Sequence, residues 1–284
     1  MLQEIEQEKQ KLKKIKKEKQ TSQKTEEEES SESKDPPAVN VGLLNVHSIK
    51  DKKDKRLKIK NLITEHNLDV FLLTETWLDN ATADEALRET VPANFSFDQQ
   101  SREGRGGGVA ILFSRALEIP SLSRNIVSLS KLFNFHLNFN SDFITTFEYV
   151  ATALRHDEWD EDVLFINVYR PPIQTKQQFD DFADQFQMLL KMASTDYNSI
   201  VVAGDFNVHV EETNNLKVFM FETVSILCGF DQHVQKPTHE KGGILDLVFR
   251  RNVEVSRVHV RDDGISDHST IYFSIRPASK DAKP

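Results

Sequence analysis

The chain has 284 residues, 38% of them hydrophobic and 19 of them phenylalanine, and its formal net charge is −9. This acidity counts against a broad basic surface for nucleic acid, and the single cysteine, Cys228, excludes a disulfide framework or a zinc–thiolate site. No apolar run approaches the length of a membrane span and no signal-peptide core is present, so we expect a soluble intracellular protein without a membrane partner.

The first 37 residues differ in composition from the rest of the chain. Residues 1–20 alternate Lys and Glu, and a run of four Glu, a Ser-rich patch and Pro36-Pro37 follow. We predict a solvated charged helix and then a disordered stretch in this 1–37 tail, a folded domain over 38–277, and a short tail over 278–284. The Lys-rich residues 11–19 give an alternative reading as a nuclear-localisation patch, and we expect a nuclear rather than a cytoplasmic location.

Hydrophobic periodicity after residue 38 predicts many strands and few helices. The predicted strands are 39–46, 69–74, 109–113, 148–154, 163–169, 199–203, 244–249, 253–260 and 269–275, and the predicted helices are 54–65, 176–193 and 216–227. Leu57, Leu62 and Ile63 are expected to share the buried face of the first helix. Helices placed between strands favour two sheets packed face to face with the helices outside.

Residues 132–147 are harder to place. Four apolar side chains alternate there with polar ones, which is the period of a strand with one polar face. We predict an edge strand, with an adhesive surface segment as the alternative.

Polar side chains stand at the ends of five predicted strands: Asn45, Glu75, Tyr169, the pair Asp205 and Asn207, and the pair Asp267 and His268. Each alone fits an ordinary cap or turn residue. Together they supply carboxylate, amide, imidazole and phenol groups above rigid strands. Attack on a phosphodiester builds negative charge on oxygen, and a metal ion with His, Asn and Tyr donors would stabilise that charge.

Seven motifs occur in an order that resembles the endonuclease/exonuclease/phosphatase superfamily, and more closely the endonuclease domain of vertebrate non-LTR retrotransposons of the long interspersed, jockey-like type. They are Leu44-Asn45, Leu73-Thr74-Glu75-Thr76-Trp77-Leu78, Gly106-Gly107-Gly108-Val109-Ala110, Asn167-Val168-Tyr169-Arg170-Pro171-Pro172, Gly204-Asp205-Phe206-Asn207, Leu245-Asp246-Leu247-Val248 and Ser266-Asp267-His268. The resemblance implies an α/β fold, a four-layer α/β/β/α sandwich of the deoxyribonuclease-I type.

The resemblance also implies roles for the residues at the predicted catalytic edge. Glu75 would be the main ligand of Mg²⁺, or of Mn²⁺ in its place, helped by Asn45 and Asp267. Asp205 would activate the attacking water and Asn207 would hold it or a phosphate oxygen. Asp246 would orient His268, and His268 and Tyr169 would donate to the phosphate.

Four further residues are expected to contact substrate along the DNA phosphate backbone. Thr238 and Arg105 match family positions near DNA, and Ser266 belongs to the Ser266-Asp267-His268 motif. His47 stands where many relatives carry Arg, Asn or Asp. We give equal weight to two interpretations of this residue, a contact to phosphate and a tolerated turn residue.

The expected function is a Mg²⁺-dependent phosphodiesterase, in the first place an endonuclease that nicks DNA and leaves a 3′-hydroxyl. The sequence leaves open a phosphatase of the same fold, an abasic-site endonuclease, and a catalytically retired domain that serves as an interaction module. Because such endonucleases continue into a reverse transcriptase, a domesticated copy, a truncated copy or an isolated domain is expected. The sequence does not predict the target-site preference, the protein partners or the oligomeric state.

Overall fold

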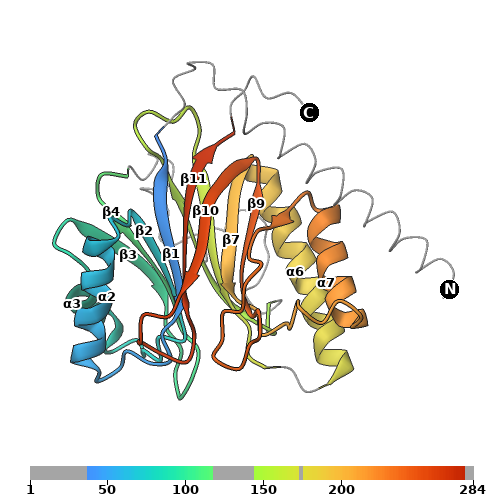
Figure 1. The fold of residues 1–284 in the computed structure, drawn as a ribbon, viewed down its shortest axis with the longest axis horizontal. Helices are drawn as coiled ribbons and strands as arrows, with labels where there is room; N and C mark the ends of the chain where they lie inside the picture. Colours follow the sequence, from blue (N-terminus) through green and yellow to red (C-terminus); the bar gives the residue numbers. More distant parts are fainter. Residues whose placement is uncertain (1–36, 118–143, 173–174, 279–284) are drawn as a thin grey trace, which may run out of the picture.

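A computed structural model describes residues 37–117, 144–172 and 175–278 and contains two mixed β-sheets that face each other (Figure 1). The six-stranded sheet has the order β10-β11-β1-β2-β4-β3 and the five-stranded sheet the order β5-β6-β7-β9-β8. In the first sheet the strands are β1 (Val39–Asn45), β2 (Val70–Thr74), β3 (Phe95–Gln100), β4 (Val109–Ser114), β10 (Val253–Arg261) and β11 (Thr270–Pro277). In the second they are β5 (Glu148–Leu154), β6 (Val163–Tyr169), β7 (Ser199–Asp205), β8 (Asp231–Gln232) and β9 (Asp246–Arg251).

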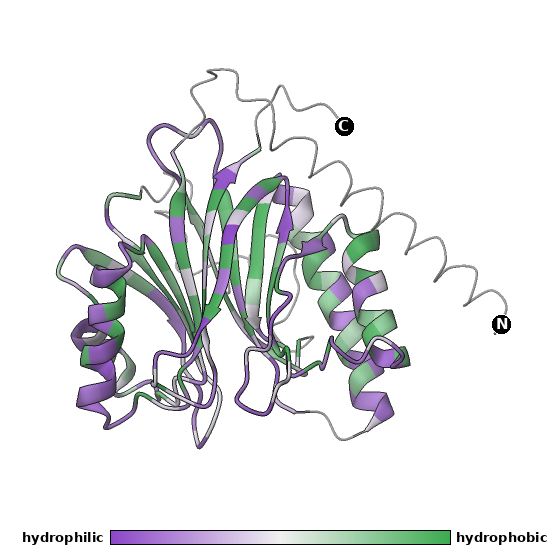
Figure 2. Ribbon diagram, viewed as in Figure 1, coloured by the Kyte–Doolittle hydropathy of each residue, from purple (hydrophilic) through white to green (hydrophobic). Residues whose placement is uncertain are grey.

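Helices cover the outer face of each sheet. α2 (Lys53–Glu65) and α3 (Ala83–Thr90) lie on the six-stranded sheet, and α6 (Lys176–Asp196) and α7 (Leu216–Leu227) lie on the five-stranded sheet. Their apolar sides turn toward the strands and their polar sides toward solvent (Figure 2). The predicted four-layer α/β/β/α sandwich is therefore confirmed.

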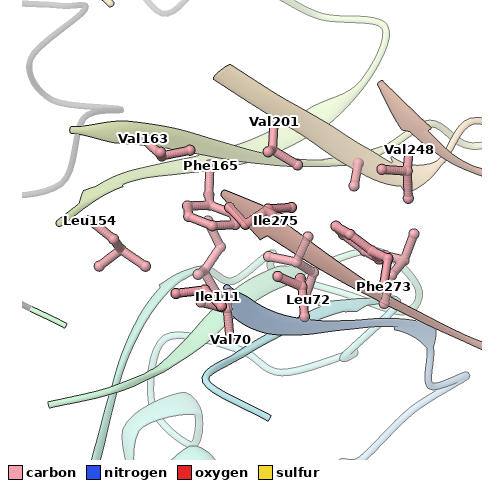
Figure 3. Close-up of a cluster of buried hydrophobic side chains, with 14 of the residues drawn as sticks. Val70, Leu72, Ile111, Leu154, Val163, Phe165, Val201, Val248, Phe273 and Ile275 are labelled. Carbon is pink, nitrogen blue, oxygen red and sulfur yellow. The ribbon is translucent and has the colours of Figure 1, made fainter. Parts of the chain in front are cut away.

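The inner core fills the space between the sheets (Figure 3). Phe165 and Val201 of the five-stranded sheet meet Leu72, Ile111 and other side chains of the six-stranded sheet. Since helices bury the outer faces too, central strands such as β6 and β7 are buried at every residue. Burial on both faces explains why these strands are continuous apolar runs without alternation.

A second core lies between the five-stranded sheet and its helices. Phe182 and Phe186 of α6 pack on Phe221 of α7, with ring centroids 5.7 and 5.4 Å apart, and on Phe206 and Phe249 beyond them. The Phe stripe of the predicted helix 176–193 is therefore core. The helix begins at Thr175, whose hydroxyl and the side chain of Gln178 form a capping box.

A polar link joins the two sheets through this otherwise apolar interior. The side-chain amide of Asn167 in β6 donates to the carbonyl oxygens of Leu73 and Ala110, at 2.8 and 2.9 Å. Leu73 and Ala110 belong to the neighbouring strands β2 and β4 of the other sheet. Asn167 is fully buried, so these two bonds fix the position of one sheet relative to the other near the end of β6.

Several predicted elements differ from the structure. Helix α3 and strands β3 and β8 were not predicted, and strand β9 begins at Asp246 instead of residue 244. Leu57 is 57% exposed and does not share the buried face of α2, because Arg56 and Ile59 occupy it instead. Arg56 is tolerated there because its guanidinium pairs with Glu89 of α3 at 3.2 Å.

Three predictions concern residues outside the described part of the chain. The tails 1–36 and 279–284 are not described, and neither are residues 118–143, which include residues 132–143 of the predicted edge strand 132–147. At its described end Phe147 is buried and precedes β5. Among the described helices, none combines the length and the apolar character that a membrane span requires.

Gly204 is the second-last residue of β7, next to Asp205, and permits a close approach to the paired strand β6. Its φ is +148°, and a Cβ at this position would lie 1.8 Å from the carbonyl oxygen of Val168 in the paired strand β6. We expect Gly204→Ala to lower the free energy of unfolding by more than about 3 kcal/mol, since a backbone atom cannot give way as a side chain can.

Urea unfolding followed by circular dichroism measures this loss. Gly104→Ala is the matched control, because Gly104 also has a positive φ of +97° but meets nothing within 4 Å. The control should lose only about 1 kcal/mol. Equal losses for the two variants would show that backbone conformation alone, not the approach of β6, requires glycine at 204.

Candidate active site

The ends of strands from both sheets meet at one edge of the sandwich, the lower edge in Figure 1. Asn45, at the end of β1, is the hub of this edge. Its amide nitrogen donates to Glu75 Oε1 at 3.1 Å and to Asp205 Oδ2 at 2.9 Å, and lies 3.5 Å from His268 Nε2. Four side chains predicted from separate strand ends are thereby brought together.

Asn45 presents its amino group, not its oxygen, to these side chains. The amide oxygen accepts the backbone N–H of His47 at 3.0 Å. In this arrangement Asn45 positions the two carboxylates, whereas ligation of a metal would require its oxygen to turn inward. The predicted role of Asn45 as a metal ligand stays a prediction.

Glu75 lies in a tight loop after β2 and is held on both carboxylate oxygens. Trp77 Nε1 donates to Oε2 at 3.0 Å, opposite the bond from Asn45 to Oε1. The loop is tied to the glycine run, because the backbone N–H groups of Thr76 and Trp77 donate to the carbonyls of Gly108 and Gly107. A Cβ on Gly108 would lie 2.4 Å from Thr76 Oγ1, so glycine is needed for this close approach.

The Asp205–Asn207 turn follows β7. Asp205 is 1% exposed, and its carboxylate accepts the backbone N–H and the side-chain amide of Asn207 at 3.0 and 3.2 Å. Burial, followed by the charge of Asp246, raises the pKa of Asp205. A carboxylate with a raised pKa is a better proton acceptor near neutral pH.

The side chain of Arg170 holds this turn in place through hydrogen bonds to its backbone. Its guanidinium donates to the carbonyl oxygens of Phe206 and Asn207, and the Asn207 amide donates back to the Arg170 carbonyl at 2.7 Å. The guanidinium is buried over the ring of Phe182, 4.8 Å from its centroid. Burial lowers the pKa of Arg170 to about 10, which leaves it charged at neutral pH.

Asp246, the first residue of β9, and His268 form a buried pair. His268 Nδ1 lies 2.7 Å from Asp246 Oδ2, which leaves Nε2 facing the site. Burial opposes the charged imidazole, but the hydrogen bond and charge of Asp246, with the charges of Asp205 and Asp267, raise the pKa of His268 to about 9. The imidazole is thus a proton donor at neutral pH.

Thr238 is buried next to the Asp246–His268 pair and does not face solvent. It is 0% exposed, and its hydroxyl accepts the backbone N–H groups of Leu245 and Asp246, both at 3.1 Å. A side chain buried in this way offers no surface to a DNA backbone in this structure, and the substrate contact predicted for Thr238 stays a prediction. Its hydroxyl instead fixes the start of β9, which carries Asp246.

Tyr169 ends β6 and faces the same group of side chains. Its hydroxyl is hydrogen-bonded to Glu75, and burial, followed by the charges of Glu75 and Asp205, raises its pKa. Tyr169 therefore keeps its proton at any physiological pH and can donate it only as a hydrogen bond.

The rim of the site carries the remaining predicted residues. Asp267 Oδ1 lies 3.1 Å from His47 Nδ1, and the exposed His47 ring lies 5.2 Å from that of Trp77. The exposed Arg105 places its guanidinium 5.2 Å from the same Trp77 ring. Ser266 is less accessible: its hydroxyl donates to the Asn45 carbonyl at 2.6 Å and accepts the His268 N–H at 3.1 Å, so it joins two parts of the site.

The backbone of these loops is locally strained. Glu75, Trp77, Asn207, His47 and Ser48 have φ values of +53°, +56°, +49°, +41° and +74°. Non-glycine residues rarely adopt this region, and such strain clusters at functional sites. Five such residues within the loops of one edge therefore support the assignment of this edge as the site.

The structure adds three residues that the sequence did not single out. Trp77 holds Glu75, Arg170 holds the Asp205–Asn207 turn, and His239 lies against His268 with ring centroids 4.7 Å apart. Trp77 and Arg170 stand inside the motifs that carry the resemblance, so their motif position was a usable signal. His239 follows Thr238 directly but had no signal of its own.

Hard oxygen donors dominate the site, as a magnesium centre requires. In the described part of the chain, two sets of side chains have ligand atoms within 4.8 Å of one another: Asp205, Asp246 and His268, and His239, Asp267 and His268. Glu75 adds a further carboxylate through Asn45. A divalent cation would offset the repulsion among these closely placed carboxylates, so the donor set fits Mg²⁺ or Mn²⁺.

The Asp246–His268 pair predicts a titration that can be measured without substrate. In metal-free protein we expect the His268 imidazole to titrate near pH 9 by NMR, and Asp246→Asn to lower that pKa by about 1 to 3. Because the folded-state pKa is raised above 6.5, the stability from this pair is fully present below pH 6.5 and lost as pH rises through 9. A His268 pKa that Asp246→Asn leaves unchanged would contradict the pairing.

A comparison with known protein families identifies the family of the chain. Residues 42–268 match the endonuclease/exonuclease/phosphatase family, and the chain belongs to that family. No curated protein is similar to the chain at a significant level in sequence.

Solved structures share the fold at low sequence identity. The endonuclease domain of TRAS1, a telomere-specific non-LTR retrotransposon, is 14% identical with a TM-score of 0.60, covering 86% of this chain and 100% of that one. D. rerio TDP2 complexed with a single-strand DNA product is 14% identical, with a TM-score of 0.57 and coverage of 84% and 99%. A Bacteroides thetaiotaomicron mannosyl-6-phosphatase is 13% identical, with a TM-score of 0.58 and coverage of 84% and 100%.

Proposed function

We propose that the protein is a Mg²⁺-dependent phosphodiesterase that nicks one strand of DNA and leaves a 3′-hydroxyl. The observation that carries the proposal is the convergence on Asn45 of a partly exposed carboxylate, a buried carboxylate and a buried imidazole. These are Glu75 Oε1, Asp205 Oδ2 and His268 Nε2, all within 3.5 Å of the Asn45 amide nitrogen. The TRAS1 endonuclease and the DNA complex of TDP2 support nucleic acid as the substrate class.

The chain's own groups divide the reaction between them. Asp205, whose pKa burial raises, accepts the proton of the attacking water, and Asn207 beside it orients that water or a phosphate oxygen. His268 Nε2 donates to the charge that develops on the phosphate, and Tyr169 donates to the same group. Asp246 accepts the Nδ1 proton, which orients the imidazole and stabilises its charged form.

Glu75 and Asp267 are the carboxylates that would hold Mg²⁺, since both are partly exposed whereas Asp205 and Asp246 are buried. When bound, the ion supplies neutralisation of phosphate charge and alignment of the scissile group. His47 and Arg105 are both exposed beside Trp77 and would contact the DNA phosphates on either side of the scissile phosphate.

Nicking of supercoiled plasmid by purified protein, with and without Mg²⁺, tests the proposal. We expect open-circular product only with the ion, and product ends that a DNA polymerase extends without prior treatment, because they carry a 3′-hydroxyl. Parallel assays with a phosphorylated sugar and with an inositol phosphate report the phosphatase alternative. Release of phosphate from either, without nicking, would replace the proposal with a phosphatase, and inactivity in every assay would leave the interaction-module reading.

Trp77→Phe should weaken the response to Mg²⁺. The change removes the N–H that holds Glu75 Oε2, while the phenyl ring keeps most of the apolar contact. Loss of a group that orients a metal ligand costs about 10- to 100-fold in metal affinity or activity. A Mg²⁺ titration of the nicking rate measures this.

Trp159→Phe is the matched control for that titration. Trp159 also donates its ring N–H, to the Pro37 carbonyl at 2.9 Å, but lies away from the site residues. Its variant should respond to Mg²⁺ as the wild type does. A Trp77→Phe protein with an unchanged Mg²⁺ response would show that Glu75 needs no support from the indole.

A further inference from the structure

The loop that carries His239 is fixed against the loop that carries His268. The backbone N–H of Ser269 donates to the Thr238 carbonyl at 2.7 Å, and the N–H of Glu240 donates to the Asp267 carbonyl at 2.9 Å. The two imidazole rings stand edge to face, at 88° with centroids 4.7 Å apart. The position of His239 in the site is therefore set by backbone bonds and does not depend on a flexible surface side chain.

Three ligand atoms converge here from His239, Asp267 and His268. Each lies within 4.8 Å of the other two, and His239 Nε2 is 3.5 Å from Asp267 Oδ2. Two imidazoles with one carboxylate differ from the all-oxygen set around Glu75. Imidazole nitrogen suits zinc and related transition metals, whereas Mg²⁺ takes oxygen ligands.

Neighbouring groups orient these ligands as they do around bound metals. Asp246 Oδ2 engages His268 Nδ1 at 2.7 Å, which directs Nε2 outward in a carboxylate–histidine arrangement typical of zinc sites. His47 Nδ1 engages the other oxygen of Asp267, Oδ1, at 3.1 Å, which leaves Oδ2 on the side of His239. The contact with His47 thus occupies Oδ1 and leaves Oδ2, the oxygen nearer His239, to ligate.

We propose that His239 Nε2, Asp267 Oδ2 and His268 Nε2 form a binding site for a transition-metal cation of the Zn²⁺ class, separate from the Mg²⁺ position at Glu75. Three protein ligands with a water in the fourth position is a common zinc arrangement. Ligand atoms around a tetrahedral zinc lie about 3.3 Å apart, so small rotations of the partly exposed His239 and Asp267 side chains would close the site around the buried His268.

Occupation of this site has a consequence for the reaction. The cation displaces the proton from His268 Nε2 to solvent and binds the lone pair, so this atom can no longer donate a proton to the phosphate. It also takes an oxygen of Asp267 away from Mg²⁺. Zn²⁺ is therefore expected to inhibit the enzyme even when Mg²⁺ is abundant.

Isothermal titration of the metal-free full chain with Zn²⁺, in millimolar Mg²⁺, tests the site. We expect the wild type to bind one tight equivalent and His239→Asn to bind it at least about tenfold more weakly. His259→Asn is the matched control, since His259 is exposed on β10 and stacks only on Tyr272, and it should bind as the wild type does. Co²⁺ in place of Zn²⁺ should give the visible absorption of a tetrahedral nitrogen–oxygen site, and His239→Asn should abolish it.

The competing position for the cation is the set of Asp205, Asp246 and His268. Asp267→Asn separates the two, because it removes a ligand from the proposed site only. Wild-type Zn²⁺ affinity in folded His239→Asn and Asp267→Asn proteins would overturn the proposal, as would loss of the wild-type equivalent to excess Mg²⁺. Neither readout depends on nicking, so the site can stand or fall separately from the proposed endonuclease activity.

Discussion

A chain carrying His268→Ala is expected to nick plasmid at least about 10²-fold more slowly than the wild type. The substitution removes the only imidazole whose Nε2 faces the hub amide of Asn45, at 3.5 Å, among the described residues. It removes a donor to the developing charge on the phosphate, and that charge exists only in the transition state. The loss should therefore fall on kcat, with little change in the KM for DNA.

His259→Ala, on the exposed side of β10, should retain wild-type nicking, and circular dichroism should show both variants folded. Asp246→Asn should cost less than His268→Ala, because the imidazole remains but loses its charged partner at 2.7 Å. Nicking at the wild-type rate by folded His268→Ala protein would exclude His268 from the chemistry.

Asp205→Asn is expected to reduce nicking by about 10²- to 10⁴-fold, the usual contribution of a general base. The carboxylate accepts two N–H groups of Asn207 and one of Asn45, and the substituted amide lacks the basic oxygen that would take a proton. Nicking by the variant should stay low at every pH, whereas the wild-type rate should fall in acid as Asp205 is protonated.

Stability measurements separate this loss from unfolding. Burial makes the charge of Asp205 costly, and Asp205→Asn removes that cost while it misplaces one hydrogen bond to the turn. We expect a folded protein with a melting temperature near that of the wild type. Asp84→Asn, an exposed change on α3, is the control for loss of a carboxylate. Retained activity in folded Asp205→Asn protein would assign the base to another group.

Much of the fold could be predicted from the sequence, because buried strands have a strong signal. Strands β5 and β6 and helix α7 have the predicted bounds. The elements that were missed have weak signals for physical reasons. Helix α3 buries two alanines, a threonine and a single leucine, and the edge strand β3 is at most partly buried after its first residue.

Helix α2 shows a different kind of error. The buried face of an isolated amphipathic helix is read from its apolar residues, which placed Leu57 inside. The true face is decided by α3, whose Glu89 receives the Arg56 guanidinium and so allows a charged residue to be buried in place of a leucine. Such pairing between helices separated by a strand is not visible in the periodicity of either one.

The site could be predicted to the level of strand ends but not of loops. Asn45 and Asp205 end strands, Glu75 follows β2 and His268 stands just before β11. The ends of these strands meet at a common edge of the sandwich. Loop residues such as His239 reach the site through tertiary contacts that have no counterpart in local sequence. The same is true of Thr238, whose burial depends on how the loop before β9 folds back.

The site is divided between the two sheets, since Asn45, Glu75 and His268 come from the six-stranded side and Asp205 with Tyr169 from the other. The proposed acid, His268, and the proposed base, Asp205, thus belong to different sheets, and the packing between the sheets sets the distance between them. The Asn167 bonds and the side chains around Phe165 make up that packing. A misplacement of about 1 Å can cost about 10²-fold in rate. The nicking rate should therefore respond to interior substitutions that change the distance between the two sheets, even when every proposed catalytic side chain is kept.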